Sequence, residues 1–419
     1  MLSPASKGWI NKYFDLLDKE EISLSLYRPE GIRKLHFMHL TLSNSGIVYG
    51  HCLSFIFAKN IDYSDWTNEE KLKFLLFESH LFIYVQVNNK KPFNRPDFIT
   101  ELCAFYQNHS SNYISSIFKV FIRESEEKKI EKVLSKRIEI KVNLLENKWW
   151  VNSLSNTFSF IDVILFDDFL HKEKSEALKS YELFAYNAML AVILAAHADG
   201  EVQTQERSIF NVFLASASLE EKTRDELKQK LETGTTFDDF SFFIKNHWLI
   251  KRYLLDVSIL TTICNDLLLD EEREFLEGFC AEFEIPIEEL DQNLNTAEHF
   301  LILSQNNVEF LKDTSSYKKV YSSLTKRWRK IILRNKEKLS EELSESKELI
   351  SLVKKSTHQE LTNEEKVLVK SQFKDLLKTV PSLAIFMIPG GAILLPLVLK
   401  IVPDLLPSAF KENKIDREK

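Results

Sequence analysis

The chain has 419 residues and a formal net charge of −7, and 44% of its residues are apolar. This composition excludes a disordered chain, collagen and a small disulfide scaffold. Only 9 residues are glycine, and we find no glycine-rich phosphate loop and no G-x-S-x-G nucleophile elbow. Because no catalytic triad or carboxylate pair occurs at a motif spacing, we expect a protein that is not an enzyme and that needs no cofactor.

Residues 1–175 predict a helical domain of unknown role. The stretch from Met1 to Glu21 has no apolar targeting core, so we expect no cleavable targeting peptide. Leu35 to Ala58 carry no formal charge, but their polar and small residues favour buried helices over a membrane span. His36 and His39 share a helix face in this interpretation, and without a third ligand at a matching spacing we interpret them as core histidines.

Capping signals indicate that the fold class is mostly α. Thr67 to Glu70, Ser218 to Glu221 and Thr362 to Glu365 each have the spacing of a capping box. Arg137 to Asn143 alternate between polar and apolar residues, and we expect one strand there at most. Residues 154–169 carry an apolar stripe at helical spacing, which predicts a core helix although three aspartates interrupt it. The four cysteines are far apart and are predicted to be reduced and buried.

Residues 176–295 contain a weak internal repeat. Leu194 to Phe213 align with Leu260 to Phe279 after a shift of 66 residues. Each copy predicts an apolar helix, a short polar turn and a second helix that begins at Thr204 or Asp270.

The first copy resembles the TerB-like helical domain of tellurite-resistance proteins. The resemblance rests on Ala196 to Gly200 followed by Glu206. Carboxylates at Asp199, Glu201 and Glu206 are oxygen ligands of the kind that a divalent cation prefers. Their spacing differs from that of a calcium-binding loop, and the second copy has leucines at the corresponding turn, so we interpret the carboxylates as helix caps and expect no metal site.

We expect residues 296–360 to form basic helices that link the domains on either side. Between Lys326 and Lys378 the chain holds 14 lysines and arginines against 9 acids. The densest basic run is Lys326 to Lys330, K-R-W-R-K, and no nucleic-acid motif accompanies it. We interpret this run as a solvated helix face and expect no specific nucleic acid as a partner, with contact to anionic lipid or RNA as the alternative.

A basic amphipathic helix and an apolar segment follow. From Thr362 onward lysines recur every four residues beside an apolar stripe, and we expect this lysine ridge to lie on anionic lipid headgroups. The 21 uncharged residues from Thr379 to Leu399 make a helix of about 31 Å, enough to cross a bilayer. Prolines and glycines inside the segment predict a kinked or re-entrant path. The ridge consists of Lys366, Lys370, Lys374, Lys378 and Lys400, and the membrane segment is marked by Pro381, Pro389, Gly390, Gly391, Pro396, Pro403 and Pro407.

Residues 361–410 resemble the membrane-anchoring segment of the LETM family, the leucine zipper and EF-hand containing transmembrane proteins. The resemblance rests on Leu361-Thr362, Val380-Pro381 and the run from Leu394 to Phe410, L-L-P-L-V-L-K-I-V-P-D-L-L-P-S-A-F. A long helical body ahead of this segment is similar to LETM-related, biofilm-associated proteins of bacteria. The resemblance implies membrane association and, for eukaryotic members, cation/proton exchange or contact with the mitochondrial ribosome.

The chain departs from the family pattern in three respects. It has no EF-hand loop and no leucine zipper, and only a polar tail, residues 411–419, follows the segment where the family has a ribosome-binding-like domain. We therefore do not expect the ribosome as a partner.

Our first hypothesis is a non-enzymatic, LETM-like helical protein, an envelope- or biofilm-associated scaffold, anchored in the inner (cytoplasmic) membrane by contact with anionic lipids. The lysine-rich flank and the reduced cysteines place its body on the cytoplasmic side. A first alternative is a cation/proton exchange component, which needs a homo-oligomer or a membrane protein partner because residues 379–399 contain no acidic carrier. A second alternative is a soluble interaction scaffold with a buried C-terminal hairpin.

Overall fold

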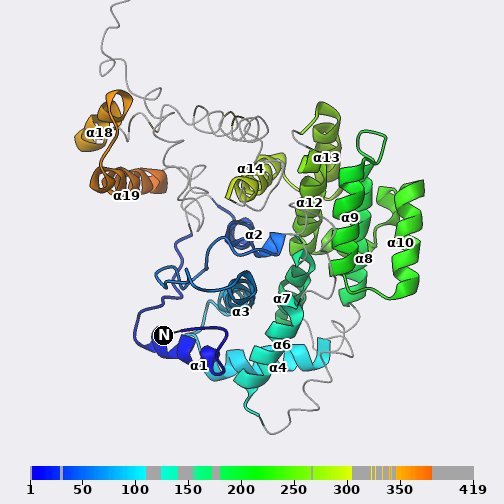
Figure 1. Cartoon of the computed structure of the whole chain (residues 1–419), viewed down its shortest axis with the longest axis horizontal. Coiled ribbons are helices and arrows are strands. Elements are labelled where there is room, and N and C mark those ends of the chain that lie inside the picture. Colours follow the sequence, from blue (N-terminus) through cyan, green and yellow to red (C-terminus); the bar gives the residue numbers. More distant parts are fainter. Residues whose placement is uncertain are drawn as a thin grey trace, which may run out of the picture. The chain divides into compact units, whose positions relative to one another are not determined.

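Figure 1 shows the computed structural model of the chain, which describes residues 2–28, 32–109, 124–139, 156–171, 180–265, 268–303 and 346–379, with residues 154, 322, 326, 333, 339 and 341. The described residues form helices and no strand, which confirms the mostly α fold class. The chain divides into two compact units, Met1–Leu26 with Met38–Val320 and Tyr27–Phe37 with Tyr321–Lys419. The first unit holds residues on both sides of the predicted boundary at 175, and the finer division into domains stays a prediction.

The N-terminal helices of the first unit pack around a cluster of aromatic rings. α3 contacts α4, α6 and α7, and α6 also contacts α1. Trp9 lies edge-on to Phe77 with 5.3 Å between ring centroids, and Tyr13 lies 5.5 Å from Phe74. Such contacts add to the large apolar area that aromatic side chains bury. The elements are α1 (Trp9–Asp18), α2 (Lys34–Ser45, in this unit from Met38 onward), η1 (Ile47–Tyr49), α3 (Asn68–Val87), α4 (Arg95–His109), α6 (Glu126–Ile138), η3 (Thr157–Ser159) and α7 (Phe160–His171).

The rest of the first unit is built around α8 and α12, which pack along each other (Figure 1). α9 and α10 pack on α8, while α13 and α14 pack on α12 and on each other. Ala188 and Ala191 of α8 are fully buried, and such small side chains allow two helices to approach closely. The elements are α8 (Ser180–Ala196), α9 (Thr204–Ser216), α10 (Glu221–Thr233), η5 (Phe237–Asp239), α11 (Phe242–Asn246), α12 (Trp248–Thr262), η6 (Ile263–Asn265), α13 (Asp270–Glu282) and α14 (Ile287–Leu303).

In the second unit, α18 (Lys347–His358) and α19 (Asn363–Thr379) form an antiparallel helix pair. Ser346 at the start of α18 donates its hydroxyl to Gln372 Oε1 in the second half of α19, at 3.1 Å. At the opposite end, Lys355 Nζ lies 2.5 Å from Glu365 Oε1. Leu349, Val353 and Val369 are among the buried apolar side chains of this pair.

Two of the three predicted capping boxes are confirmed. The hydroxyls of Thr67 and Thr362 accept the backbone N–H three residues on, and Glu70 and Glu365 accept the N–H of those threonines. The third box is wrong. Ser218 has φ +51°, and α10 begins at Glu221 without a side-chain cap. A capping side chain needs an extended backbone at its own residue, and Ser218 has a left-handed one.

The predicted strand at Arg137 to Asn143 is wrong in its first residues, because Arg137 and Ile138 end helix α6. Residues 140–143 lie outside the described part of the chain. The alternation of polar and apolar side chains here comes from the last turn of a helix, in which Ile138 is buried and Arg137 makes an ion pair with Asp162. The aspartates of α7 that interrupt the apolar stripe are likewise buried rather than solvated.

The uncharged stretch from Leu35 to Ala58 forms α2, η1 and the loop after them, and most of its side chains are buried, as predicted. Gly46 and Gly50 both have positive φ. A Cβ on Gly50 would lie 2.3 Å from the backbone of Thr157, so this turn can approach η3 only without a side chain.

None of the helices in the described ranges is long and apolar enough to cross a membrane. Thr379 is the last residue of α19. The rest of the predicted apolar segment, residues 380–399, lies outside the described residues, so the kinked membrane path stays a prediction.

Glu78 in the middle of α3 holds three parts of the N-terminal region together. Its carboxylate is fully buried and accepts the backbone N–H groups of Ile56, Phe57 and Ala58 at 2.6, 3.2 and 2.9 Å. It also accepts the hydroxyl of Tyr13 at 3.0 Å. Burial raises the pKa of Glu78 to about 7, although these four donors favour the ionised form.

Replacing Glu78 by alanine should lower the free energy of unfolding by about 3 kcal/mol, because four donors lose a buried acceptor. The folded-state pKa is raised above the unfolded value of about 4.3. The stability contributed by protonated Glu78 is therefore full below about pH 4 and is lost as the pH rises toward about 7.

Urea unfolding of the wild type and of Glu78→Gln, which cannot titrate, measures this effect. Between pH 5 and pH 7 the wild type should lose about 2 kcal/mol of stability relative to the variant. An identical pH dependence of the two proteins would show that Glu78 does not titrate in this range.

Candidate functional site

The predicted lysine ridge lies on α19. Lys366, Lys370, Lys374 and Lys378 all belong to this helix, and positions four residues apart fall on one side of an α-helix. Lys366 is exposed. The side chains of the other three, and Lys400 as a whole, lie outside the described residues.

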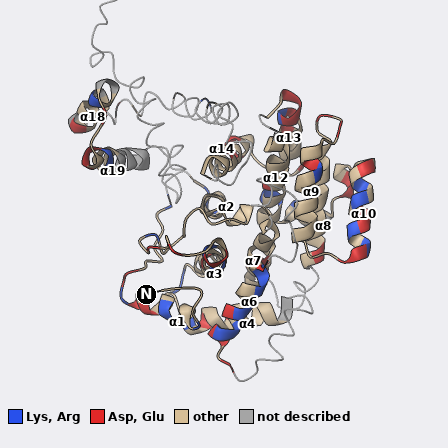
Figure 2. Cartoon of the chain, in the orientation of Figure 1, with Lys and Arg blue, Asp and Glu red and all other residues tan. Residues whose placement is uncertain are grey.

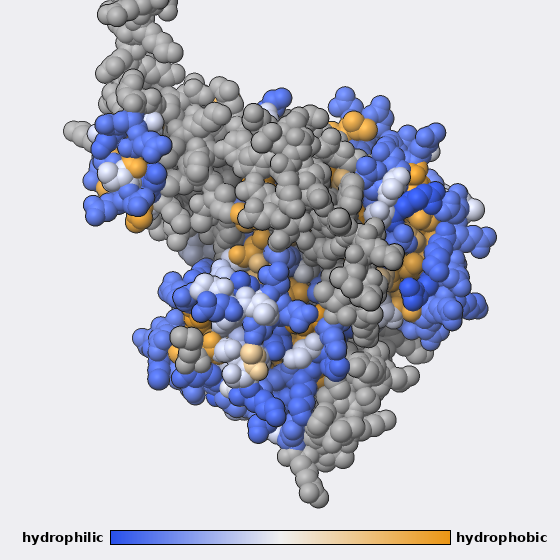
Figure 3. All heavy atoms as spheres, in the orientation of Figure 1, coloured by the Kyte–Doolittle hydropathy of each residue, from blue (hydrophilic) through white to orange (hydrophobic). Residues whose placement is uncertain are grey.

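The lysine side of α19 also presents an apolar residue. Val367 is 68% exposed and Leu368 is 37% exposed, whereas Val369 is buried. At about 100° per residue, Val367 falls within the arc that the four lysines cover, and Val369 falls on a different side. Figure 3 shows apolar atoms among hydrophilic ones on the described part of α18 and α19. This side of the helix therefore offers both positive charge and apolar surface.

The first turn of α19 is fixed by charge as well as by its capping box. Glu364 and Glu365 lie at the positive end of the helix dipole, and the ridge lysines follow toward its negative end. The hydrogen bond from Lys355 lowers the pKa of Glu365, and the bond from the Thr362 backbone contributes to the same shift. The start of the helix is thus held to α18 by an ion pair.

The prolines and glycines of the predicted membrane segment come after α19 in the chain. They all follow Thr379 and lie outside the described residues: Pro381, Pro389, Gly390, Gly391, Pro396, Pro403 and Pro407.

Each copy of the predicted repeat contains two helices joined by a turn, α8 and α9 in the first copy and α12 and α13 in the second, and the repeat itself stays a prediction. Glu206 Oε2 accepts the backbone N–H of Gln203 at 2.7 Å, and Glu272 Oε2 accepts that of Leu269 at 2.7 Å. Both glutamates are buried. Equivalent carboxylates thus fix the start of the second helix in each copy. The TerB-like resemblance of this region stays a prediction.

The carboxylates of the first turn act within the turn. Asp199 accepts the Glu201 backbone N–H at 3.3 Å and the Gln203 side-chain amide at 3.1 Å. Burial raises the pKa of Glu272 to about 7, and the nearby Asp199 carboxylate adds to the rise. Within the described ranges, no group of three or more His, Cys, Asp or Glu side chains is arranged to hold a metal ion.

A capping role for Glu206 predicts a specific pattern of substitution effects. Glu206→Ala should lower the free energy of unfolding by about 1 kcal/mol, because the start of α9 loses a hydrogen-bond acceptor. Glu206→Gln should lower the free energy of unfolding by less than Glu206→Ala does, since an amide oxygen can accept the same hydrogen bond. Urea unfolding with calcium and with a chelator gives the measurement. If calcium stabilises the wild type and not the glutamine variant, the carboxylate is a ligand and the capping interpretation fails.

His39 is a buried core histidine, as predicted. Its Nε2 atom lies 2.7 Å from Asp256 Oδ2 in α12, and Asn293 in α14 donates to the other carboxylate oxygen at 3.2 Å. Ser43 Oγ also lies close to Nε2, at 3.2 Å. A catalytic triad needs the serine and the aspartate on opposite ring nitrogens, so this Ser–His–Asp group does not have the geometry of an acyl-transfer site.

Sequence reasoning missed Asp256 and Asn293. The available signal was a single carboxylate in a mostly apolar run, L-L-D-V-S-I-L. A buried carboxylate of this kind is expected to have a partner. The sequence contains nothing that identifies His39 as that partner, because 217 residues separate the two.

Comparison with known proteins gives one match. Residues 361–419 match the family described as LETM1-like, RBD. No curated protein and no solved structure matches the chain. The match begins just before α19 and supports the LETM-like resemblance of this region. It also runs through residues 411–419, the polar tail that we expected to depart from the family pattern. The similarity to bacterial biofilm-associated proteins stays a prediction.

Proposed function

We propose that this chain is a membrane-associated LETM-type protein without enzymatic activity, in which α19 and the segment after it attach a helical body to the bilayer. The observation that carries the proposal is the LETM1-like match at residues 361–419. The finer parts of the proposal rest on the physical chemistry of the same residues.

Two features of this region fit a lipid surface. The side of α19 with Lys366 and Val367 combines cations with an exposed apolar side chain, the combination by which interfacial helices bind anionic headgroups. A single such helix binds reversibly, and stable attachment takes a second signal. The 21 uncharged residues from Thr379 to Leu399 supply that signal.

The charge distribution also favours an orientation. Lysines lie on both sides of the apolar segment, on α19 before it and at Lys400, Lys411 and Lys414 after it. A re-entrant path keeps both positive flanks on the cytoplasmic side, where positive residues are retained. The four cysteines are free thiols, as expected in a reducing compartment. We therefore place the body on the cytoplasmic side of the inner membrane, with anionic lipids as its partners.

Replacing the four α19 lysines of the ridge by glutamine should weaken binding to vesicles of anionic lipid by about a hundredfold or more, because each lysine near such a surface contributes about 1 kcal/mol. Co-sedimentation of the full-length protein with vesicles, at low and at high salt, measures the change. The variant combines Lys366→Gln, Lys370→Gln, Lys374→Gln and Lys378→Gln.

A matched control removes the same charge from the first unit at exposed positions and should leave vesicle binding nearly unchanged: Lys90→Gln, Lys91→Gln, Lys222→Gln and Lys228→Gln. Equal losses in both variants would mean that overall charge, not the ridge, binds lipid. Full release of the wild type from cell membranes by a carbonate wash would contradict insertion of the apolar segment. Aggregation after deletion of residues 379–419 would instead favour a segment buried in the protein.

Cation/proton exchange is the second candidate, because the LETM1-like match extends over the apolar segment. Residues 379–399 contain no acidic side chain, so exchange would require an assembly of several chains or a membrane partner. Purified protein in liposomes decides between the two functions. Proton movement that depends on a cation gradient supports exchange, and its absence supports an anchor alone.

A further inference from the structure

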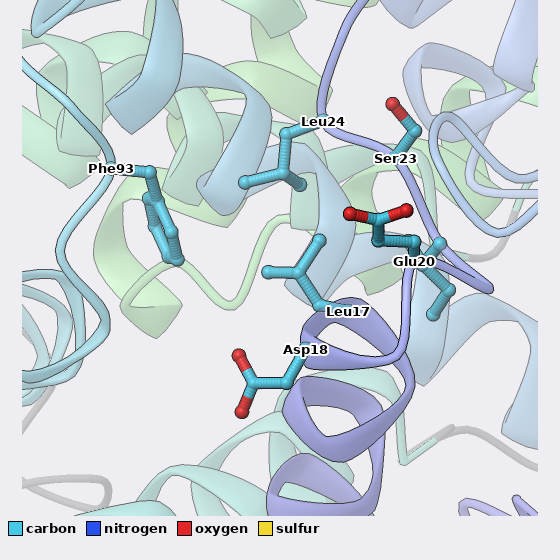
Figure 4. A pocket seen from close by; sticks show the side chains of 7 residues that line it. Leu17, Asp18, Glu20, Ser23, Leu24 and Phe93 are labelled. Atoms are coloured by element: carbon cyan, nitrogen blue, oxygen red, sulfur yellow. The ribbon is translucent and has the colours of Figure 1, made fainter.

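A cleft of about 620 Å³ opens at the C-terminal end of α1 (Figure 4). Leu17, Ile22, Leu24 and Phe93 supply apolar walls, and Asp18 and Glu20 supply carboxylates. Phe93 comes from the loop before α4, whereas the others belong to α1 and the chain directly after it. All these residues belong to the first unit.

Phe93 is a fixed wall of this cleft. Its ring stacks on Phe14 with 6.1 Å between centroids and an interplanar angle of 18°, and it meets Tyr84 edge to face with 6.2 Å between centroids. Phe93 is only partly buried, and Figure 4 shows its ring turned toward Leu17 and Leu24 across the open space. An aromatic ring with one face packed and the other open is suited to stacking with a planar cation.

The carboxylates of Asp18 and Glu20 lie at the end of a helix that disfavours negative charge. Asp18 is the last residue of α1 and Glu20 follows two residues later, so both are at the negative end of the helix dipole. Both are exposed. Neither carboxylate forms an ion pair with any residue that the structure describes. A bound cation would compensate this local repulsion.

Glu20 is also held in a left-handed conformation, with φ +61°. Glycine is the usual residue at this position after a helix because a side chain is strained there. In Figure 4 the Glu20 carboxylate lies between Leu17 and Leu24 and points into the cleft. The left-handed backbone is what places the carboxylate there.

We propose that this cleft binds a partner protein through an arginine that is flanked by apolar residues. A guanidinium group stacks on the open face of Phe93 and pairs with Glu20 and Asp18, and its planar fork suits a carboxylate better than a lysine ammonium does. Apolar neighbours of the arginine cover Leu17, Ile22 and Leu24. A polyamine or free arginine would leave these walls in water, so the occupant is a protein segment. The proposal does not depend on membrane attachment.

Fluorescence anisotropy with a labelled Gly-Leu-Arg-Leu-Gly peptide and full-length protein, without vesicles, tests the proposal. We expect saturable binding with a Kd below about 1 mM. The same peptide with citrulline in place of arginine keeps the shape and loses the charge, and it should bind about tenfold more weakly or worse. Glu20→Gln and Phe93→Leu should each weaken binding of the arginine peptide by about tenfold.

Glu284 provides a matched control. It is an exposed glutamate with φ +52° that follows α13. Glu20→Gly and Glu284→Gly both relieve strain and should both raise the thermal midpoint, but only Glu20→Gly should lose peptide binding. Unchanged binding in Glu20→Gln, equal binding of the citrulline peptide, or an equal loss in Glu284→Gln would each overturn the proposal. Lysine variants of α19 should bind the peptide normally, which separates this result from the membrane experiment.

Discussion

A carboxylate taken out of water must be met by hydrogen-bond donors or by a cation, and this requirement organises the first unit. Glu78 gathers the backbone of residues 56–58 and Tyr13 onto α3. Asp162 in α7 is paired with Arg137 in α6 through two contacts of 2.6 Å. Each buried carboxylate therefore determines which parts of the chain become neighbours, while the aromatic and aliphatic side chains around it provide the bulk of the burial.

Sequence reasoning succeeded where the cause of a structure is local. The capping boxes at Thr67 and Thr362 were predictable because the two bonded residues are three positions apart. The two helices and the turn in each copy of the proposed repeat were predictable from local patterns for the same reason. The capping box predicted at Ser218 was wrong because the backbone of Ser218 is left-handed, although the spacing to Glu221 fits the motif. The strand prediction at Arg137 was wrong because Arg137 and Ile138 form the last turn of α6. The buried partner of Arg137, Asp162, is 25 residues away and could not be seen in the local pattern.

The same distinction separates the two surfaces proposed to bind partners. The lysine ridge could be predicted from the sequence, because residues four positions apart lie on the same side of an α-helix. The cleft beside α1 is not readable, since it depends on Phe93, which reaches α1 only through the packing of rings around Phe14. A left-handed glutamate is equally invisible before the backbone is known. A surface built by one element can thus be predicted, and a surface built by two distant ones needs the fold.

Three of the four cysteines are buried as predicted, whereas Cys52 is partly exposed, and burial gives the three a further property. It raises the pKa of the Cys103 thiol to about 11 and that of Cys280 to about 12, and it raises the pKa of Cys264 well above its ordinary value. Glu206 and Glu272, the paired capping residues of the repeat, add to the rise at Cys264. Because only a thiolate attacks an alkylating reagent, these sulfurs stay inert while the helices are closed. Their rate of alkylation therefore reports how often the helices around them open.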